Sequence, residues 1–225
     1  MKQKNRFGTL SLTACNGHGI ITPRRNLMDA TKGKKLYGPS EGFRNLYKAI
    51  ISLPDFKAGK RSGALDLKFQ ERIMLAVTEV NGCPLCTYVH TRIALEAGLA
   101  DGEVVQLLEG ALSHAPDQEK EALLFAQHYA DSRGKYSKKA FDRIVETYGR
   151  KNARAILGAI RLIMVGNTYG IPMGSFSSRF GGDKSKKDSR STFGYELAML
   201  LTFVPFGIIA FFSAHVARLF GSNPE

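Results

Sequence analysis

Apolar residues recur at steps of three and four along most of the chain, which is the spacing of one face of an α-helix. In residues 41–54 these positions are Phe43, Leu46, Tyr47 and Ile50, and Pro54 is expected to end the helix. The same spacing predicts helices over residues 65–80, 83–98, 101–108, 116–129, 138–148 and 153–165. No stretch of five or more residues alternates as a strand does, so the pattern predicts an all-α domain of six to eight helices.

The pattern changes after this domain. Residues 170–192 are rich in Gly and Ser and carry the charged run 184–188, a composition typical of a flexible linker. Residues 197–217 contain no Asp, Glu, Lys or Arg, and about twenty apolar residues suffice to cross a bilayer as a helix. This segment is therefore expected to span a membrane, with the basic run before it on the cytoplasmic side, or to be a helix buried in the core or at an oligomer interface.

These changes divide the chain into four parts. We expect a basic, irregular N-terminal arm (1–40), a helical domain (41–170), a flexible basic linker (171–192) and an apolar C-terminal helix (193–220). The arm contains Cys15, which we interpret as an incidental thiol.

Positive charge is concentrated near the N-terminus. The chain has a formal net charge of +12, and residues 1–61 hold 13 Lys and Arg against 3 Asp and Glu. The helical domain is close to neutral, whereas a nucleic-acid-binding module normally carries its positive charge on the folded domain. We therefore expect no nucleic-acid partner. A basic arm is also suited to an anionic membrane surface.

Candidate chemistry is concentrated in residues 82–90, Gly-Cys-Pro-Leu-Cys-Thr-Tyr-Val-His. At 100° per residue, Cys83, Cys86 and His90 fall within a strip about 60° wide on one helix face. An imidazole four residues from a thiol can take its proton, and the first helical turn favours a thiolate, so a lowered thiol pKa is expected. Two cysteines at this spacing can also close a disulfide, the minimum needed for two-electron thiol chemistry.

The same residues are compatible with a metal site or with a purely structural role. A zinc site could use both cysteines, His90 and a carboxylate, and two buried thiols beside a core histidine would have no chemistry at all. A c-type haem site is excluded, because it needs His directly after the second cysteine, where Thr87 stands. His114 and His128 are interpreted as surface or core groups, and His215 as a membrane-interface residue if the span exists.

Glu71, eleven intervening residues and then Cys83-x-x-Cys86-x-x-x-His90 resemble the signature of the AhpD-like alkylhydroperoxidases of the carboxymuconolactone decarboxylase superfamily. The segments 63–66 and 166–170 also look like family sequence, and the resemblance covers about residues 40–170. It implies an AhpD-like helical bundle that assembles into homotrimers or homohexamers. It does not cover the N-terminal arm or the C-terminal helix.

The resemblance also implies a thiol-dependent peroxidase for antioxidant defence, without cofactor or metal. Cys86 would attack the hydroperoxide and Cys83 would resolve it, while Glu71 and His90 would relay protons. A thiol or dithiol, of lipoyl or thioredoxin-like type, would reduce the disulfide. Some members have a His between the cysteines, where this chain has Leu85, so the relay expected here is shorter. A general disulfide oxidoreductase and a non-catalytic, membrane-associated helical oligomer are the alternatives, and a soluble cytoplasmic protein is the alternative to a membrane-anchored one.

Overall fold

The computed structural model describes residues 36–181 and 187–219, and these residues form seven α-helices and no strand. The helices are α2 (Pro39–Arg61), α3 (Leu67–Asn81), α4 (Pro84–Glu96), α5 (Asp101–Leu108), α6 (Asp117–Asp131), α7 (Lys138–Phe180) and α8 (Phe193–Leu219). The prediction of an all-α bundle with an apolar C-terminal helix is confirmed. Most of the N-terminal arm, with Cys15, and the middle of the expected linker lie outside the described residues.

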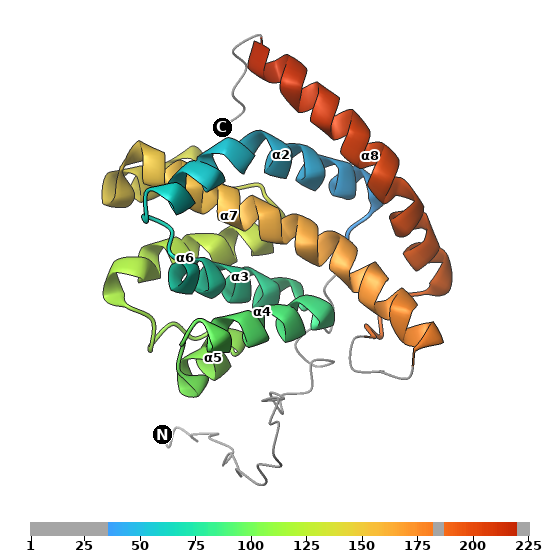
Figure 1. The fold of residues 1–225 in the computed structure, drawn as a ribbon, viewed down its shortest axis with the longest axis horizontal. Coiled ribbons are helices and arrows are strands. Elements are labelled where there is room, and N and C mark those ends of the chain that lie inside the picture. The colour runs from blue at the N-terminus through green and yellow to red at the C-terminus, as the bar shows by residue number, and fades with distance from the viewer. Residues whose placement is uncertain (1–35, 182–186, 220–225) are drawn as a thin grey trace, which may run out of the picture.

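The long helix α7 runs through the middle of the bundle (Figure 1). Helix α2 lies along one side of it and α8 lies outside α2, whereas α3, α4, α5 and α6 lie on the other side. Helix α7 contacts α2, α3, α4, α6 and α8. It is therefore the element through which the C-terminal helix and the helices of the cysteine motif are connected.

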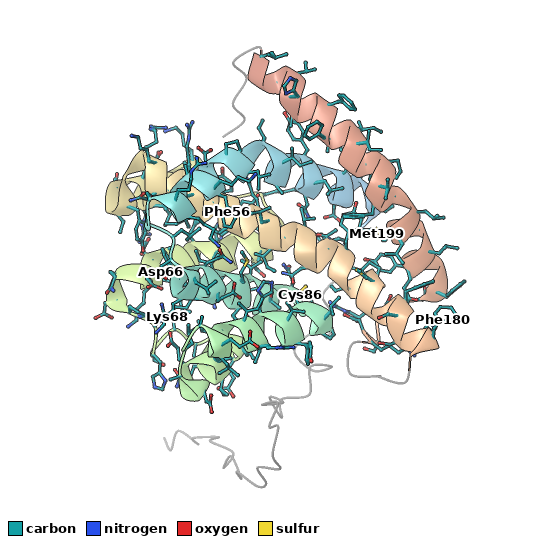
Figure 2. The ribbon with its side chains drawn as sticks, viewed as in Figure 1. Phe56, Asp66, Lys68, Cys86, Phe180 and Met199 are labelled. Atoms are coloured by element: carbon teal, nitrogen blue, oxygen red, sulfur yellow. The ribbon has the colours of Figure 1, made fainter. Side chains whose placement is uncertain are left out.

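Two apolar clusters hold these layers together. The larger one lies chiefly among α3, α6 and α7, and includes the fully buried Ile73, Leu123 and Ile160. The smaller one joins α2, α7 and α8 through Leu46, Tyr169, Met199 and Ala210. Figure 2 places Met199 on the side of α8 that faces the bundle. The apolar C-terminal helix thus adds a second, smaller core to the one that the sequence pattern predicts.

The prediction that Pro54 ends the first helix is wrong, because α2 continues through Pro54 to Arg61. A proline inside a helix costs about 3 kcal/mol, since it removes one backbone hydrogen bond and crowds the preceding turn. Close packing of the same helix on α7 compensates for this loss. A Cβ on Gly59 would collide with the Cβ of Ala155, and one on Gly158 would lie 3.0 Å from the Cβ of Phe56.

The prediction for helix α7 is correct at its internal break and wrong at its C-terminal end. The break expected between residues 148 and 153 occurs at Gly149, whose φ of 74° and ψ of 153° interrupt the helix. The expectation of a flexible linker is wrong for residues 171–180, which continue α7. Ile171 and Ser175 are buried there, and the Ser177 and Ser178 hydroxyls donate to the Gly174 carbonyl. Burial therefore makes a helix of a segment whose composition is typical of a linker.

Helix α8 packs on the domain with one face only. Glu196, Met199, Ala210 and Ala214 are buried, and the Glu196 carboxylate accepts from Arg179 Nε at 2.6 Å. Its remaining large apolar side chains are mostly exposed. Both α7 and α8 are long and apolar enough to cross a membrane, but 78% of the apolar window of α7 is buried against 17% of that of α8. Helix α7 is accordingly a core helix, and α8 alone keeps the properties predicted for a span.

Candidate active site

Helix α3 places the predicted acid inside the bundle. Asp66 precedes the helix, and its carboxylate accepts from the Phe69 amide at 2.8 Å, which satisfies one of the free amides of the first turn. Glu71 follows one turn later and its side chain is 1% exposed. A carboxylate at such a position needs hydrogen-bonding partners, because burial without them is costly.

Both Glu71 oxygens have a partner. Oε2 lies 2.8 Å from His90 Nδ1, and Oε1 accepts from Gln70 Nε2 at 3.0 Å. The His90 side chain is 18% exposed, so the pair extends from the interior toward the surface. The predicted contact between Glu71 and His90 is present, and Gln70 adds a partner that the sequence pattern did not identify.

A tight turn carries the two cysteines. Gly82 ends α3 in the left-handed region, with φ of 62°, and Cys83 is the residue that caps α4 before Pro84 begins it. Cys83 Sγ accepts from the Cys86 amide at 3.3 Å. Cys83 is thus placed at the positive end of the α4 dipole, where a negative sulfur is favoured.

The two sulfurs lie against each other. Cys83 Sγ and Cys86 Sγ are 2.6 Å apart, and both residues are free cysteines. A disulfide requires about 2.05 Å, so the pair can be bonded by a small movement. Cys83 is fully buried and Cys86 is 7% exposed. Of the two, Cys86 is therefore the sulfur that a substrate can reach more readily.

Helix α7 closes the site from the other side. A Cβ added to Gly170 would lie 2.9 Å from Cys86 Sγ and 3.1 Å from Cys83 Sγ. Figure 2 shows Cys86 between the ribbons of α4 and α7. Thr78 Oγ1 also donates to Asn167 Oδ1 at 3.2 Å, three residues before Gly170. The segment 166–170, which resembles family sequence, therefore packs directly on the cysteine pair.

The protonation of Cys86 differs from the expectation. The hydrogen bond with Cys83, burial and the charge of the neighbouring sulfur all raise the pKa of the Cys86 thiol, whereas a lowered pKa was expected from the helix start and His90. The reason is that two sulfurs in contact cannot both ionise easily in a buried site. Cys86 consequently keeps its proton until a base removes it.

The remaining candidates are not assembled into a second site. Among the residues that the structure describes, no group of three or more His, Cys, Asp and Glu is placed to hold a metal ion, so the zinc alternative lacks a ligand set there. His114, His128 and His215 are exposed. Arg190 approaches the cysteine turn from the segment before α8. The sequence pattern did not identify this contact, because Arg190 and Gly82 lie more than a hundred residues apart in the chain.

Comparison with known protein families supports the resemblance and the fold. Residues 46–128 match the profile of the Carboxymuconolactone decarboxylase family, and this stretch contains Glu71, both cysteines of the pair and His90. No curated protein and no solved structure matches the chain. The segment that carries the cysteine pair, residues 46–128, therefore belongs to the carboxymuconolactone decarboxylase family, the superfamily of the AhpD-like proteins.

Proposed function

We propose that the protein is a thiol-dependent peroxidase that cycles Cys83 and Cys86 between dithiol and disulfide. The observation that carries this proposal is the contact between the two sulfurs, 2.6 Å apart, in a chain that also pairs His90 with Glu71. The family includes decarboxylases and peroxidases. Peroxide reduction can use two adjacent thiols, because each turnover removes two electrons from them.

The first step is oxidation of Cys86. His90 Nδ1 donates to Glu71, which leaves Nε2 to accept the Cys86 proton as the sulfur attacks the terminal peroxide oxygen. An S–O bond forms and the O–O bond breaks. The leaving alkoxide takes the proton from His90 and departs as an alcohol, while Cys86 becomes a sulfenic acid. Because its pKa is raised, Cys86 depends on this base during the attack.

The second step uses Cys83. Its sulfur attacks Cys86, an S–S bond forms, the S–O bond breaks, and the hydroxyl leaves as water after taking the proton of Cys83. Overall the peroxide gains two electrons and the dithiol loses two. An external thiol or dithiol, lipoyl-like or thioredoxin-like, then reduces the disulfide and is itself oxidised to a disulfide.

Replacement of single cysteines tests the proposal. With an organic hydroperoxide and a small dithiol, Cys86→Ser should lower turnover by at least about a hundredfold, since the nucleophile is lost. Cys83→Ser should consume about one equivalent of peroxide and then stop, with a sulfenic acid detectable on Cys86. Cys15→Ser is the matched control and should behave as the native chain.

The competing functions give different results in the same assay. A general disulfide oxidoreductase would exchange disulfides with small dithiols but would not consume peroxide. A non-catalytic helical oligomer would do neither. If Cys86→Ser consumed peroxide at the native rate, the role given to Cys86 would be wrong.

We further propose that α8 attaches the protein to a membrane, with the domain on the cytoplasmic side. Most of the large exposed side chains of α8 are apolar, among them Leu201, Val204, Ile208 and Phe212. The sequence before α8 carries Lys184, Lys186 and Lys187. Lysines close to a membrane segment favour the cytoplasmic side of the bilayer. The full chain should float with liposomes. If it instead stays in solution as a trimer or hexamer, α8 is an oligomer-interface helix.

A further inference from the structure

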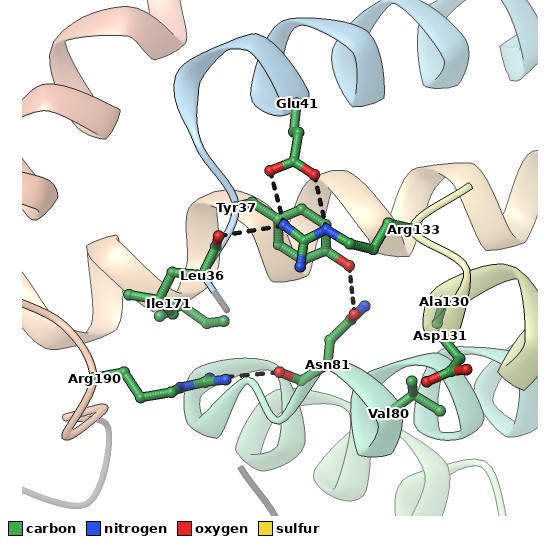
Figure 3. Close-up of a pocket in the computed structure, with 10 residues that line it drawn as sticks. All are labelled: Leu36, Tyr37, Glu41, Val80, Asn81, Ala130, Asp131, Arg133, Ile171 and Arg190. Atoms are coloured by element: carbon green, nitrogen blue, oxygen red, sulfur yellow. Dashed lines mark hydrogen bonds and ion pairs between the residues drawn. The ribbon is translucent and has the colours of Figure 1, made fainter. Parts of the chain in front are cut away.

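The segment between α7 and α8 reaches back to the turn that carries Cys83. Arg190 Nη2 donates to the Gly82 carbonyl at 3.2 Å. It also donates to the Asn81 carbonyl at 3.5 Å (Figure 3). These are carbonyls at the C-terminal end of α3, where a helix has no further amides of its own to bond them. Arg190 therefore binds the two peptide groups that come directly before Cys83.

Arg190 is itself held in place. Its Nε donates to Asp188 Oδ1 at 2.9 Å, and its backbone amide donates to the same oxygen at 2.8 Å. Asp188 is buried, and its own amide donates to Ser175 Oγ on α7 at 3.0 Å. The guanidinium is thus linked to α7 through Asp188, and it binds the cysteine turn directly.

The turn has a second support on its other side. Tyr37 OH donates to Asn81 Oδ1 at 2.6 Å, and Asn81 Nδ2 donates to Met164 Sδ at 3.3 Å. Between these supports lies a cavity of about 480 Å³, with Arg190 and Asn81 among its lining residues (Figure 3). Side-chain packing is therefore incomplete next to the turn, and the position of its backbone depends on these few hydrogen bonds.

We propose that Arg190 is a positioning residue for the cysteine pair. By fixing the Asn81 and Gly82 peptides it keeps Cys83 Sγ within bonding reach of Cys86 Sγ, which favours the disulfide over the dithiol. This inference rests on the proposed thiol chemistry. It goes beyond the family, because the matched residues end at 128 and Arg190 lies outside them.

Arg190 acts through the local effective concentration of the two thiols. Two thiols form a disulfide more readily when the chain holds them near the bonded geometry, since less conformational freedom is lost on bonding. A planar guanidinium can bind Asp188 and two carbonyls at once, whereas an ammonium has no such fork. The positioning role therefore requires arginine and not merely a positive charge.

The test measures the equilibrium between the reduced protein plus oxidised glutathione and the disulfide protein plus two reduced glutathiones, by thiol trapping across glutathione mixtures. Arg190→Gln and Arg190→Lys should both lower this equilibrium constant by about tenfold, the factor that 1.4 kcal/mol gives. Asp188→Asn should lower it less, because it loosens Arg190 without removing it. Asp188→Asn also tests the inference if the Arg190 variants fail to fold.

Arg179→Gln is the matched control. Arg179 holds α8 through Glu196 and donates to the Ser191 carbonyl at 3.4 Å, but it bonds none of the cysteine turn, so its loss should lower the equilibrium constant much less than Arg190→Gln does. Native values in Arg190→Gln would overturn the inference, as would native values in Arg190→Lys or an equal loss in Arg179→Gln. If the native chain formed no Cys83–Cys86 disulfide in any mixture, the proposed function itself would fail.

Discussion

The cysteine site buries polar side chains, whereas helix α8 exposes apolar ones, so the two regions depart in opposite ways from the usual pattern of burial. At the cysteine site the Glu71 carboxylate is buried, and it has partners close by in His90 and Gln70. In α8 apolar side chains are exposed, and no described residue covers them. A soluble monomer buries its charges reluctantly and rarely leaves a large apolar face uncovered. The proposed function would account for both regions by something outside the isolated chain, a peroxide substrate in one case and a lipid surface in the other.

The two regions also differ in how they relate to the family. The cysteine pair lies inside the matched residues 46–128, whereas α8 lies beyond them. They are nevertheless joined through adjacent residues of α7, because Tyr169 packs against Phe203 of α8 and Gly170 packs against both sulfurs. Helix α8 is thus attached to the wall of the cysteine site.

The largest effect is expected from placing charge on the exposed apolar face of α8. Ile208→Lys combined with Phe212→Lys should weaken binding to liposomes by at least about a hundredfold, because burial of each side chain contributes roughly 2–3 kcal/mol. Flotation measures this. The control is Leu67→Lys with Leu124→Lys, which adds equal charge at exposed positions of α3 and α6 and should float like the native chain. Equal loss in both variants would show that added charge, and not α8, controls binding.

A smaller effect is expected from crowding the buried region. Gly170→Ala places a methyl group about 3 Å from both sulfurs and should lower peroxide turnover by roughly ten- to a hundredfold, since a displacement of 1 Å has an effect of that size. Gly166→Ala on the same helix meets only Ile163 Cδ1, at 3.3 Å, and should retain most activity. Turnover with an organic hydroperoxide compares the two. Similar activity in both variants would show that contact with Gly170 does not position the sulfurs.

The smallest effect concerns the proton on Cys86. The raised pKa of Cys86 leaves less of its thiolate at pH 8. The hydrogen bond and the charge of Cys83 are two of the causes of this raised pKa. Cys83→Ala should therefore lower the pKa of Cys86 and speed its alkylation by iodoacetamide several-fold at pH 8. Peptide mass mapping follows Cys86 alone. Unchanged or slower alkylation would show that contact with Cys83 does not raise this pKa.

Much of the fold could be predicted because helix formation follows a local repeat. The break near Gly149 and the helices of the cysteine motif were recognisable from apolar spacing and turn residues alone. The errors occurred where tertiary packing overrode composition. Pro54 lies inside α2, and the Gly- and Ser-rich residues 171–180 form a helix, because each segment is packed against a neighbouring helix.

The sequence by itself determined that Cys86 and His90 share one edge of a helix, since helical geometry relates residues four apart, whereas Cys83 caps that helix in an extended conformation. It also determined that residues 197–217 are free of Asp, Glu, Lys and Arg. Only the tertiary structure decided that Gly170 packs on both sulfurs, that Arg190 bonds the turn before Cys83, and that the neighbouring thiol raises the pKa of Cys86. The contacts of Gly170 and Arg190 join residues far apart in the chain, and burial depends on the packing of whole helices, which no local pattern specifies.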